Sequence, residues 1–368
     1  MKILLTGADG FIGKNLRIAL SERDGYEVLP VTRTTTAAEL GQLAVMADAV
    51  IHLAGVNRPH DPVEFTTGNA DFTLQLCAAL RAGGRAVPVA FASSIQADRN
   101  NLYGSSKLAA EQILSAYSTD TGAPVAIYRL ANVFGKWCRP NYNSAVATFC
   151  HNIARGLPIQ INDAAAEVRL VYVDDVVRSL LEFLAAPCQG VIYAEAGPVY
   201  SSTVGELARQ IEAFGEVRHG LLTERVGEGL VRALYATYVS YLPPEAFSYS
   251  VTKHSDARGV FVEMLKTKDS GQFSFFTAHP GVTRGGHYHH SKTEKFLVIK
   301  GQARFKFRHI VTNETYALDT SGEQAMIVET IPGWSHDITN TGHDELVVML
   351  WANEIFDRIH PDTIACKV

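Results

Sequence analysis

The sequence predicts an α/β protein in which an N-terminal doubly wound parallel sheet is followed by a C-terminal all-β barrel. Over roughly the first 200 residues, short apolar runs alternate with stretches of helical character, the pattern of parallel β-α-β units. From residue 245, short apolar or aromatic runs are separated only by glycine-rich or polar turns, which is typical of a β-sandwich or small barrel. The 368 residues exceed one domain of about 100–200 residues, and we expect domains at 1–240 and 245–368.

The composition excludes several classes of protein. Hydrophobic residues make up 47% of the chain and charged residues 19%, enough apolar material for real cores. A net charge of −5 argues against a partner held by phosphate neutralisation, so we expect no nucleic acid. The five cysteines are scattered, without a CxxC pair, which fits reduced thiols. The reduced thiols indicate a cytoplasmic protein. Since no apolar run reaches about 18 residues, we expect neither export nor a membrane anchor.

The first element is a strand, KILL (2–5), followed by the turn TGADGFIG (6–13) and a helix that we expect to start at Gly13. In this pattern Gly7 permits a tight turn, Gly10 lets the backbone approach a pyrophosphate, and Gly13 permits close packing of helix on strand. The free N–H groups and partial positive charge of the helix N-terminus favour phosphate. The turn therefore predicts a dinucleotide site.

The second strand, EVLPVTR (27–33), bears on the choice of cofactor. An acidic residue that holds the ribose 2′-hydroxyl of NAD usually stands at its end, but here Thr32 and Arg33 stand there. An arginine without a competing carboxylate suits a 2′-phosphate, so NADPH is favoured over NADH. The alternative is an ordinary arginine of a solvated loop. Further buried strands at 47–55 and 86–94 predict a parallel sheet whose ligand crevice lies at the strand carboxyl ends.

Two short motifs carry the predicted chemistry, ASSIQ (92–96) and YGSSK (103–107). Tyr103 and Lys107 are four residues apart and share one face of a helix, so the ammonium of Lys107 is expected to lower the pKa of the phenol. Ser94, at a strand end, is expected to polarise a carbonyl oxygen that Tyr103 protonates, while Lys107 also holds the nicotinamide ribose. Because the motif contains two adjacent serines, the choice between Ser93 and Ser94 stays open.

Six motifs in this order, TGADGFIG, VIHLAG, SSIQ, YGSSK, YRLANVFG and VYVDDVV, resemble the nucleotide-sugar branch of the extended short-chain dehydrogenase/reductase family over about the first 230 residues. The resemblance implies a Rossmann-like sheet. It also implies that the dinucleotide lies against residues of the first two motifs: Gly7, Gly10, Phe11, Ile12, Gly13, Leu53 and Ala54.

The same resemblance implies a substrate pocket downstream of the catalytic helix. Asn132 is expected beside a sugar diphosphate, and Lys136 and Arg139 are candidate diphosphate contacts, with plain surface charge as the alternative. Asp174 and Asp175 invite an acid/base assignment, but in the family this motif is mainly structural. We therefore expect no catalytic role for these two carboxylates.

The segment ATYVSYLPPEAFSY (236–249) is rich in tyrosine and contains Pro243–Pro244, which predicts an extended connector with a boundary near Glu245. Beyond it, the composition predicts strands at 259–265, 271–279, 295–301, 302–310, 325–331 and 345–353.

A candidate metal site follows in the second half. His287 and His289 are two apart on a strand and face the same side, and Glu294 can return to that side on the next strand. With His336 they provide three imidazoles and a carboxylate, suited to zinc or another first-row divalent ion. The spacing resembles both signature motifs of the cupin barrel, the second running from His336 to Asn340. The alternative is a metal-free cupin whose histidines act as bases.

Over essentially the whole chain, segments such as GVNRP (55–59), FGKWCRPNYNS (134–144) and YATYVSYLP (235–243) resemble bifunctional enzymes of capsular polysaccharide precursor synthesis that join such a reductase to a cupin. The resemblance implies C3 epimerisation of a UDP-2-acetamido-2,6-dideoxy-4-keto-hexose in the cupin. NADPH-dependent C4 reduction to UDP-2-acetamido-2,6-dideoxy-L-talose follows, in a homodimer on the route to UDP-N-acetyl-L-fucosamine.

Two questions stay open at this level. The cupin is alternatively a structural dimerisation module braced by its metal, which leaves a monofunctional reductase; four protein ligands favour that reading because structural zinc sites are closed. The general base of the epimerisation is also unassigned. Tyr288 and His290 alternate away from the ligand face of a regular strand, whereas Lys295, Arg304 and Lys306 are either candidate bases in the pocket or solvent residues.

Overall fold

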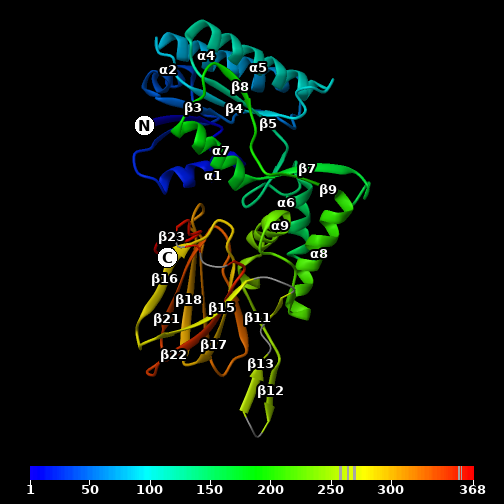
Figure 1. Cartoon of the computed structure of the whole chain (residues 1–368), viewed down its shortest axis with the longest axis vertical. Coiled ribbons are helices and arrows are strands. Elements are labelled where there is room, and N and C mark those ends of the chain that lie inside the picture. Colours follow the sequence, from blue (N-terminus) through cyan, green and yellow to red (C-terminus); the bar gives the residue numbers. More distant parts are fainter. Residues whose placement is uncertain (257–258, 263–264, 268–270, 355–356, 358) are drawn as a thin grey trace. The chain divides into compact units, whose positions relative to one another are not determined.

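The structure, a computed structural model, describes residues 1–256, 259–262, 265–267, 271–354, 357 and 359–368. It divides into two compact units, Met1–Ser144 with Val168–Ser201, and Ala145–Glu167 with Ser202–Val368 (Figure 1). The second unit therefore includes helices that precede residue 240, and the boundaries 1–240 and 245–368 stay a prediction about sequence domains. A helix with the length and hydropathy of a membrane span does not occur in the described part of the chain.

The first unit is built on a six-stranded parallel sheet with the order β2-β1-β3-β4-β5-β8. The order reverses at β1, where a doubly wound sheet opens its ligand crevice. This confirms the predicted fold class for the N-terminal part. The strands are β1 (Lys2–Thr6), β2 (Glu27–Val31), β3 (Ala49–His52), β4 (Val89–Ser94), β5 (Val125–Leu130) and β8 (Val191–Ala194).

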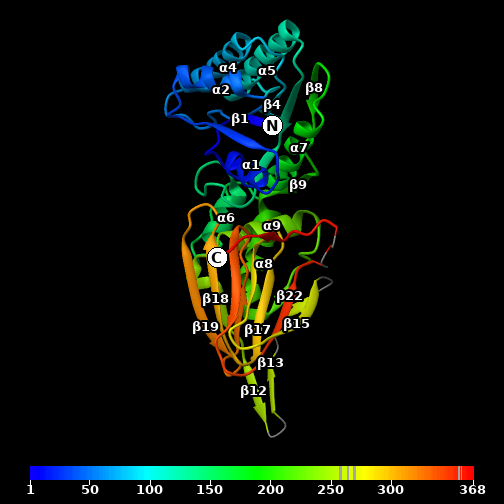
Figure 2. The same cartoon turned by 90° about the vertical axis from the view of Figure 1, so that its left-hand side faces the viewer.

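Helices cover both faces of this sheet. Apolar side chains of α1 (Phe11–Ser21) and α7 (Val173–Ala185) form one core with the strands, and those of α2 (Ala37–Met46), α4 (Phe72–Ala82) and α5 (Leu102–Thr121) form the other. Figures 1 and 2 show these two sets on opposite sides of the strands. The remaining elements are α3 (Val63–Phe65), a π-helical turn η1 (Thr66–Asp71) and a small sheet of β6 (Asn132–Phe134), β7 (Glu167–Tyr172) and β9 (Val199–Thr203).

Two local predictions require correction. Helix α1 begins at Phe11 rather than at Gly13, because Gly10 is extended and takes the N-cap position. The predicted connector at 236–249 is largely not extended, since residues up to 240 belong to α9 (Gly229–Ser240) and Pro244–Ala246 form a 3₁₀ turn. Tyr238 of this segment faces a helical core, with the Phe214 and Tyr238 rings 5.9 Å apart. The helix ends shortly before Pro243–Pro244, where proline cannot continue it.

The helices of the second unit are α6 (Ala145–Ile153), α8 (Val204–Gly220) and α9, followed by the 3₁₀ turn η2 (Pro244–Ala246). The three helices pack against one another.

Two five-stranded antiparallel sheets form the barrel of the second unit (Figure 2). Their inner faces meet through aromatic rings such as those of Phe296 and Phe305, 5.7 Å apart. This confirms the predicted all-β cupin barrel, although residues 263–264 of the strand expected at 259–265 lie outside the described residues. The first sheet is β11 (Ser248–Ser250), β20 (Met326–Glu329), β17 (Glu294–Lys300), β22 (Leu346–Ala352) and β15 (Gln272–Ala278).

The second sheet is β19 (Thr315–Ser321), β18 (Gln302–His309), β21 (Trp334–Asn340), β16 (Thr283–Tyr288) and β23 (Ile364–Ala365). Two short pairs complete the unit, β10 (Leu222–Thr223) with β14 (Lys266–Thr267), and β12 (Lys253–Asp256) with β13 (Gly259–Val262).

A buried ion network joins helix α8 to the barrel. The carboxylate of Glu329 accepts from Lys295 of β17 and from Arg218 of α8. Burial by itself raises the pKa of Glu329, but the two cations outweigh it and hold that pKa below its usual value. Since a buried charge without a partner is strongly destabilising, this network ties α8 to the barrel wall.

Replacing Glu329 by Gln is expected to lower the free energy of unfolding by about 3–5 kcal/mol, because Lys295 and Arg218 keep buried charges without a counterion. Chemical denaturation of the full chain measures this. Asp319→Asn is the matched control: its pair with Arg304 is also within barrel strands, but the Asp319 side chain is 62% exposed against 5% for Glu329, so little change is expected. Equal effects of both variants contradict the assignment.

Candidate active sites

The glycine-rich turn closes tightly around the end of β1. Gly7 has a φ of +67°, and a Cβ there would lie 2.8 Å from the backbone nitrogen of Ala54. A Cβ on Gly13 would lie 2.2 Å from the carbonyl oxygen of Gly7, so α1 packs against the turn only because residue 13 is glycine. No side chain caps α1 in the described structure. The N–H groups of its first turn, which holds Phe11 and Ile12, are therefore available to a phosphate.

Other predicted cofactor residues lie at the same edge of the sheet. The backbone N–H groups of Leu53 and Ala54 both donate to the Thr6 hydroxyl, at 3.1 Å each, which draws the end of β3 against the end of β1. Arg33 follows β2, is exposed and has no ion pair among the described residues. Because β1 pairs with both β2 and β3, the carboxyl ends of these strands are neighbours.

The predicted catalytic residues come from β4 and α5. Ser94 ends β4, and its side chain hydrogen-bonds with the Tyr103 hydroxyl. Ser93 faces the other way and donates to the buried carboxylate of Glu111, as alternation along a strand requires. The structure thus favours Ser94 over Ser93 as the serine beside the phenol. Lys107 is buried on the same helix face as Tyr103, and its Nζ donates to the Ala92 carbonyl oxygen at 2.9 Å.

The electrostatics of this site differ from the prediction. The pKa of Tyr103 is raised, because burial outweighs the hydrogen bond with Ser94. Burial also lowers the pKa of Lys107 to about 8, against the opposing charge of Glu111. The expected lowering of the phenol pKa by Lys107 is therefore not found. Its ammonium is directed to a backbone carbonyl, and desolvation dominates.

Glu111 is a residue of this site that the sequence reasoning missed. Besides Ser93, it accepts from Arg129 Nη2 at 2.7 Å and from Arg129 Nε at 3.0 Å. The available signal was spacing, since Tyr103, Lys107 and Glu111 recur every four residues on one helix face. Glu111 holds the end of β4 and so helps to fix where Ser94 points.

The predicted substrate residues are placed differently from one another. Asn132 is exposed and donates to the Arg169 carbonyl at 3.0 Å, and Arg139 is exposed with its guanidinium over the Tyr142 ring at 5.2 Å. Lys136 is 1% exposed and forms an ion pair with Asp174 at 2.7 Å. A diphosphate at Lys136 therefore has to compete with Asp174, whereas Arg139 is accessible.

The family expectation for Asp174 and Asp175 agrees with this geometry. Both stand in the first turn of α7, where carboxylates interact favourably with the helix dipole. Asp174 pairs with Lys136, and Asp175 pairs with Arg178 at 2.7 Å. Their partners are cations of the fold, as in a structural role.

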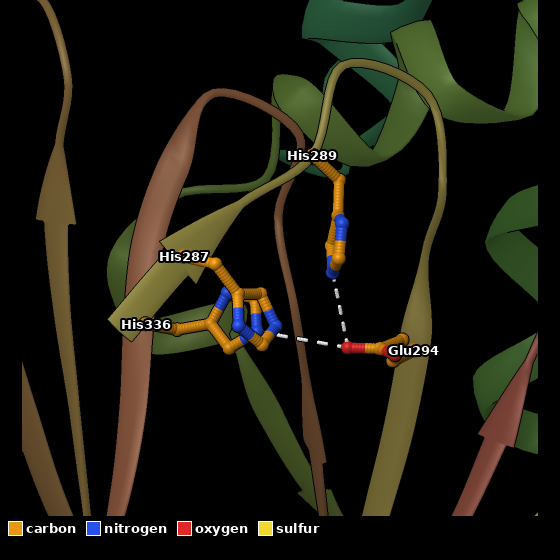
Figure 3. Close-up of side chains that lie close together, drawn as sticks. All are labelled: His287, His289, Glu294 and His336. Atoms are coloured by element: carbon orange, nitrogen blue, oxygen red, sulfur yellow. Dashed lines mark hydrogen bonds and ion pairs between the residues drawn. The ribbon is translucent and has the colours of Figure 1, made fainter. Parts of the chain in front are cut away.

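The structure brings all four predicted metal ligands together inside the barrel (Figure 3). His287 of β16 stands directly opposite His336 of β21 in the strand pairing, Glu294 begins β17, and His289 lies in the loop between β16 and β17. One nitrogen or oxygen from each residue lies within 4.8 Å of the other three. Glu294 Oε2 is 3.1 Å from His289 Nε2 and 3.6 Å from His336 Nε2.

This donor set fits a divalent ion. Ligands at about 2.0–2.2 Å from a tetrahedral ion are separated by about 3.3–3.6 Å, close to the two distances from Glu294. His336 Nε2 is buried and has no hydrogen-bond partner among the described residues, and burial together with its histidine neighbours lowers the pKa of His287 to about 3. Neutral imidazoles and an ionised carboxylate are the states that bind metal.

Lys292 is a second residue that the sequence reasoning missed, because nothing in its spacing relates it to the ligands. Its Nζ is 2.8 Å from Glu294 Oε1, so the carboxylate faces a cation on one oxygen and the imidazoles on the other.

Two of the candidate bases are engaged elsewhere: Lys295 with Glu329, on the opposite face of β17, and Arg304 with Asp319 at 2.8 Å. Burial raises the pKa of Asp337, and the charge of Lys306 opposes that rise. The Tyr288 and His290 rings lie edge to face at 5.6 Å. The base stays unassigned.

Comparison with known proteins agrees with both halves of the fold. A family model described as the NAD dependent epimerase/dehydratase family matches residues 3–194, more than half of the chain. The chain belongs to this family. It is therefore a nicotinamide-dependent enzyme. A second model, described as the polysaccharide biosynthesis C-terminal domain, matches residues 254–364.

Two similar proteins match this family member over its whole length, and a third matches over 58% of it. A UDP-2-acetamido-2,6-beta-L-arabino-hexul-4-ose reductase of Pseudomonas aeruginosa is 60% identical over 100% of this chain and 99% of its own. The crystal structure of the capsular polysaccharide assembling protein CapF from Staphylococcus aureus superposes with a TM-score of 0.69 at 40% identity, covering 100% of both chains. The UDP-glucuronic acid 4-epimerase of Bacillus cereus has the same fold over 58% of this chain and 83% of its own, with a TM-score of 0.52 at 21% identity.

The two serines of β4 are expected to separate on mutation. Ser94→Ala should lower kcat with the nicotinamide cofactor by about 10²–10³-fold, because it removes the hydroxyl that we expect to donate to the reacting oxygen. Ser93→Ala, the matched control, should lower thermal stability through its lost bond to Glu111 while kcat changes only severalfold. Steady-state kinetics and melting curves on both variants test this, and the reverse pattern would show that Ser93 is the catalytic serine.

Proposed function

We propose that the chain is a bifunctional nucleotide-sugar enzyme. Its cupin barrel epimerises C3 of a UDP-2-acetamido-2,6-dideoxy-4-keto-hexose, and its reductase unit reduces C4 with NADPH to UDP-2-acetamido-2,6-dideoxy-L-talose. The observation that carries the proposal is the presence, in one chain, of Ser94 hydrogen-bonded with Tyr103 beside Lys107, and of four converging metal donors in a barrel. The first set supplies the proton donor for a reduction, and the second supplies ligands for an ion that assists an epimerisation whose general base is unassigned.

In the reductase, NADPH supplies a hydride to C4 when it is bound. Tyr103 donates its phenolic proton to the carbonyl oxygen, and its raised pKa keeps that proton in place at neutral pH. Ser94 hydrogen-bonds to the same oxygen and orients it. Lys107 holds the nicotinamide ribose. Arg33 binds the 2′-phosphate that distinguishes NADPH from NADH.

In the barrel, the C4 carbonyl acidifies the proton on C3, and removing and returning that proton from opposite faces inverts the carbon. His287, His289, Glu294 and His336 would hold a divalent ion, with zinc expected, whose charge stabilises the negative charge that develops on the carbonyl oxygen. His287 is the ligand that is only half-buried, so the substrate is expected to approach from its side.

The relatives support the substrate class. The Pseudomonas relative is named as a reductase of a UDP-linked 4-keto sugar, and the Staphylococcus relative as a protein of capsular polysaccharide assembly. By analogy we propose a UDP-sugar substrate, with Asn132 and Arg139 beside its diphosphate, and a homodimer. All five cysteines are described and none forms a disulfide, which fits the reducing cytoplasm that we propose as its location.

One alternative has observations in its favour. The Pseudomonas relative is named for the reduction only, and four protein ligands resemble the closed coordination of structural zinc sites. On this view the chain is a monofunctional 4-keto-sugar nucleotide reductase, and the barrel is a dimerisation module braced by its ion.

Two single variants decide between these functions. Tyr103→Phe is expected to abolish NADPH oxidation, because the phenol supplies the proton, while deuterium exchange from solvent at C3 continues. His289→Ala is expected to reduce metal content and C3 exchange together, because one of four ligands is lost. It should leave the reduction of an already epimerised keto sugar intact, and each variant thus serves as the control for the other.

Metal content, deuterium incorporation by mass spectrometry and NADPH turnover are measured on the same preparations. Normal exchange in metal-free protein would end the metal-assisted mechanism. A melting temperature that falls in His289→Ala while wild-type protein shows no exchange at C3 would establish the structural alternative.

Arg33→Asp is expected to lower kcat/KM for NADPH relative to NADH by about 10–100-fold. It replaces a charge-assisted hydrogen bond to the 2′-phosphate by repulsion. The ratio of kcat/KM for the two cofactors measures the effect. Arg209→Asp, an exposed arginine of α8, is the matched control and should leave the ratio unchanged. An unaltered preference in Arg33→Asp would show that another residue selects the cofactor.

A further inference from the structure

His289 differs from the other three metal-ligand candidates in how its backbone is held. His287, Glu294 and His336 lie within strands β16, β17 and β21, where the pairing of neighbouring strands fixes them. His289 follows the end of β16 at Tyr288 and stands in the loop before Glu294. A ligand on a loop needs other contacts to keep its ring in a productive geometry.

Asp362, in the C-terminal segment, supplies these contacts. Its carboxylate accepts the backbone N–H groups of His290, Ser291 and Lys292 at 2.7 Å each, and the Ser291 hydroxyl at 2.9 Å. One side chain thus satisfies four donors of the loop, which follows directly on His289. Such charge-assisted hydrogen bonds are stronger than neutral ones.

The same residue orients the imidazole. His289 Nδ1 is 2.5 Å from the main-chain carbonyl oxygen of Asp362, and because a carbonyl only accepts, Nδ1 carries the hydrogen. That tautomer leaves the lone pair on Nε2, the nitrogen 3.1 Å from Glu294 Oε2. Figure 3 shows the His289 ring pointing from the loop toward Glu294. A hydrogen bond on the distal nitrogen is the usual means of fixing a metal-binding histidine.

Helix α9 braces the same loop. Arg232 donates to the Ser291 hydroxyl at 2.5 Å and pairs with Glu354 at 2.6 Å. Ser291 therefore receives the guanidinium on one side and donates to Asp362 on the other. The loop is held between a helix of the second unit and the C-terminal segment, 70–73 residues away from it in sequence.

We infer that Asp362 is the positioning residue of the metal centre: its carboxylate clamps the 290–292 loop and its carbonyl sets the tautomer and direction of His289. The inference rests on the proposed metal site and adds a residue that does not itself ligate. Its role is exercised through His289, so the measurable consequence is metal affinity and coordination geometry.

Replacing Asp362 by Asn in the full chain tests the role. Asparagine keeps the shape but loses the charge and one acceptor oxygen, and the loop donors are then incompletely satisfied. Zinc affinity, measured by competition with a chromogenic chelator, is expected to weaken by about 10–100-fold. The visible absorption spectrum of the Co²⁺-loaded variant is expected to shift from that of wild type, because the ligand geometry changes.

Asp357→Asn is the matched control. Asp357 belongs to the same segment and also accepts backbone N–H groups, those of Ile359 at 2.7 Å and His360 at 3.1 Å. Within the described part of the chain, no hydrogen bond or ion pair joins it to the 290–292 loop. Its zinc affinity should equal that of wild type. Ser291→Ala removes one hydroxyl and is expected to weaken zinc severalfold. If metal-free Asp362→Asn does not fold, as judged by the lack of a cooperative melting transition, the zinc affinity of Ser291→Ala is used to test the inference instead.

The outcomes separate this inference from the proposed function. The positioning role is overturned if wild type binds stoichiometric zinc and folded Asp362→Asn has the same zinc affinity and the same Co²⁺ spectrum. That result leaves the proposed function standing. Unchanged affinity in Ser291→Ala overturns the positioning role where Asp362→Asn does not fold. A wild-type chain that binds no zinc overturns both.

Discussion

A buried carboxylate must be paired with cations or with several hydrogen-bond donors, and this constraint applies in both halves of the molecule. Glu111 is met by Ser93 and the fork of Arg129 beneath the reductase site, and Glu329 by Lys295 and Arg218 under the barrel wall. In each place the satisfied carboxylate joins elements that are distant in sequence.

Backbone topology decides where chemistry collects in the first unit. Parallel strands end at one edge, so the loops after β1, β2 and β3 and the end of β4 meet although they are dozens of residues apart. Small residues make the approach possible, since a Cβ at Gly7 or Gly13 would strike backbone atoms. The edge brings together a helix terminus suited to phosphate, on α1, and the candidate proton donor Tyr103, on α5 across the sheet.

In the barrel, antiparallel pairing does the equivalent task. The register sets His287 opposite His336, and the opposed sheet contributes Glu294 across the interior. Imidazoles in such a place resist protonation, as the low pKa of His287 shows, and the carboxylate remains ionised because burial is outweighed by its histidine and lysine neighbours. Neutral imidazoles and an ionised carboxylate are the states that bind a divalent cation.

The sequence alone determined the features that depend on local spacing: the glycine turn, the Tyr103 and Lys107 pair on one helix face, the two-residue step from His287 to His289, and the two fold classes. Periodicity and turn chemistry encode these directly. Only the tertiary structure decided that Ser93 donates to Glu111, so that Ser94 is the serine beside Tyr103. It also decided that Lys136 pairs with Asp174 and that part of the connector is helical. The contact of Asp362 with the 290–292 loop likewise appears only in the folded chain. Each depends on which distant segments pack together and on how far burial shifts a pKa. Spacing within a single segment does not carry that information.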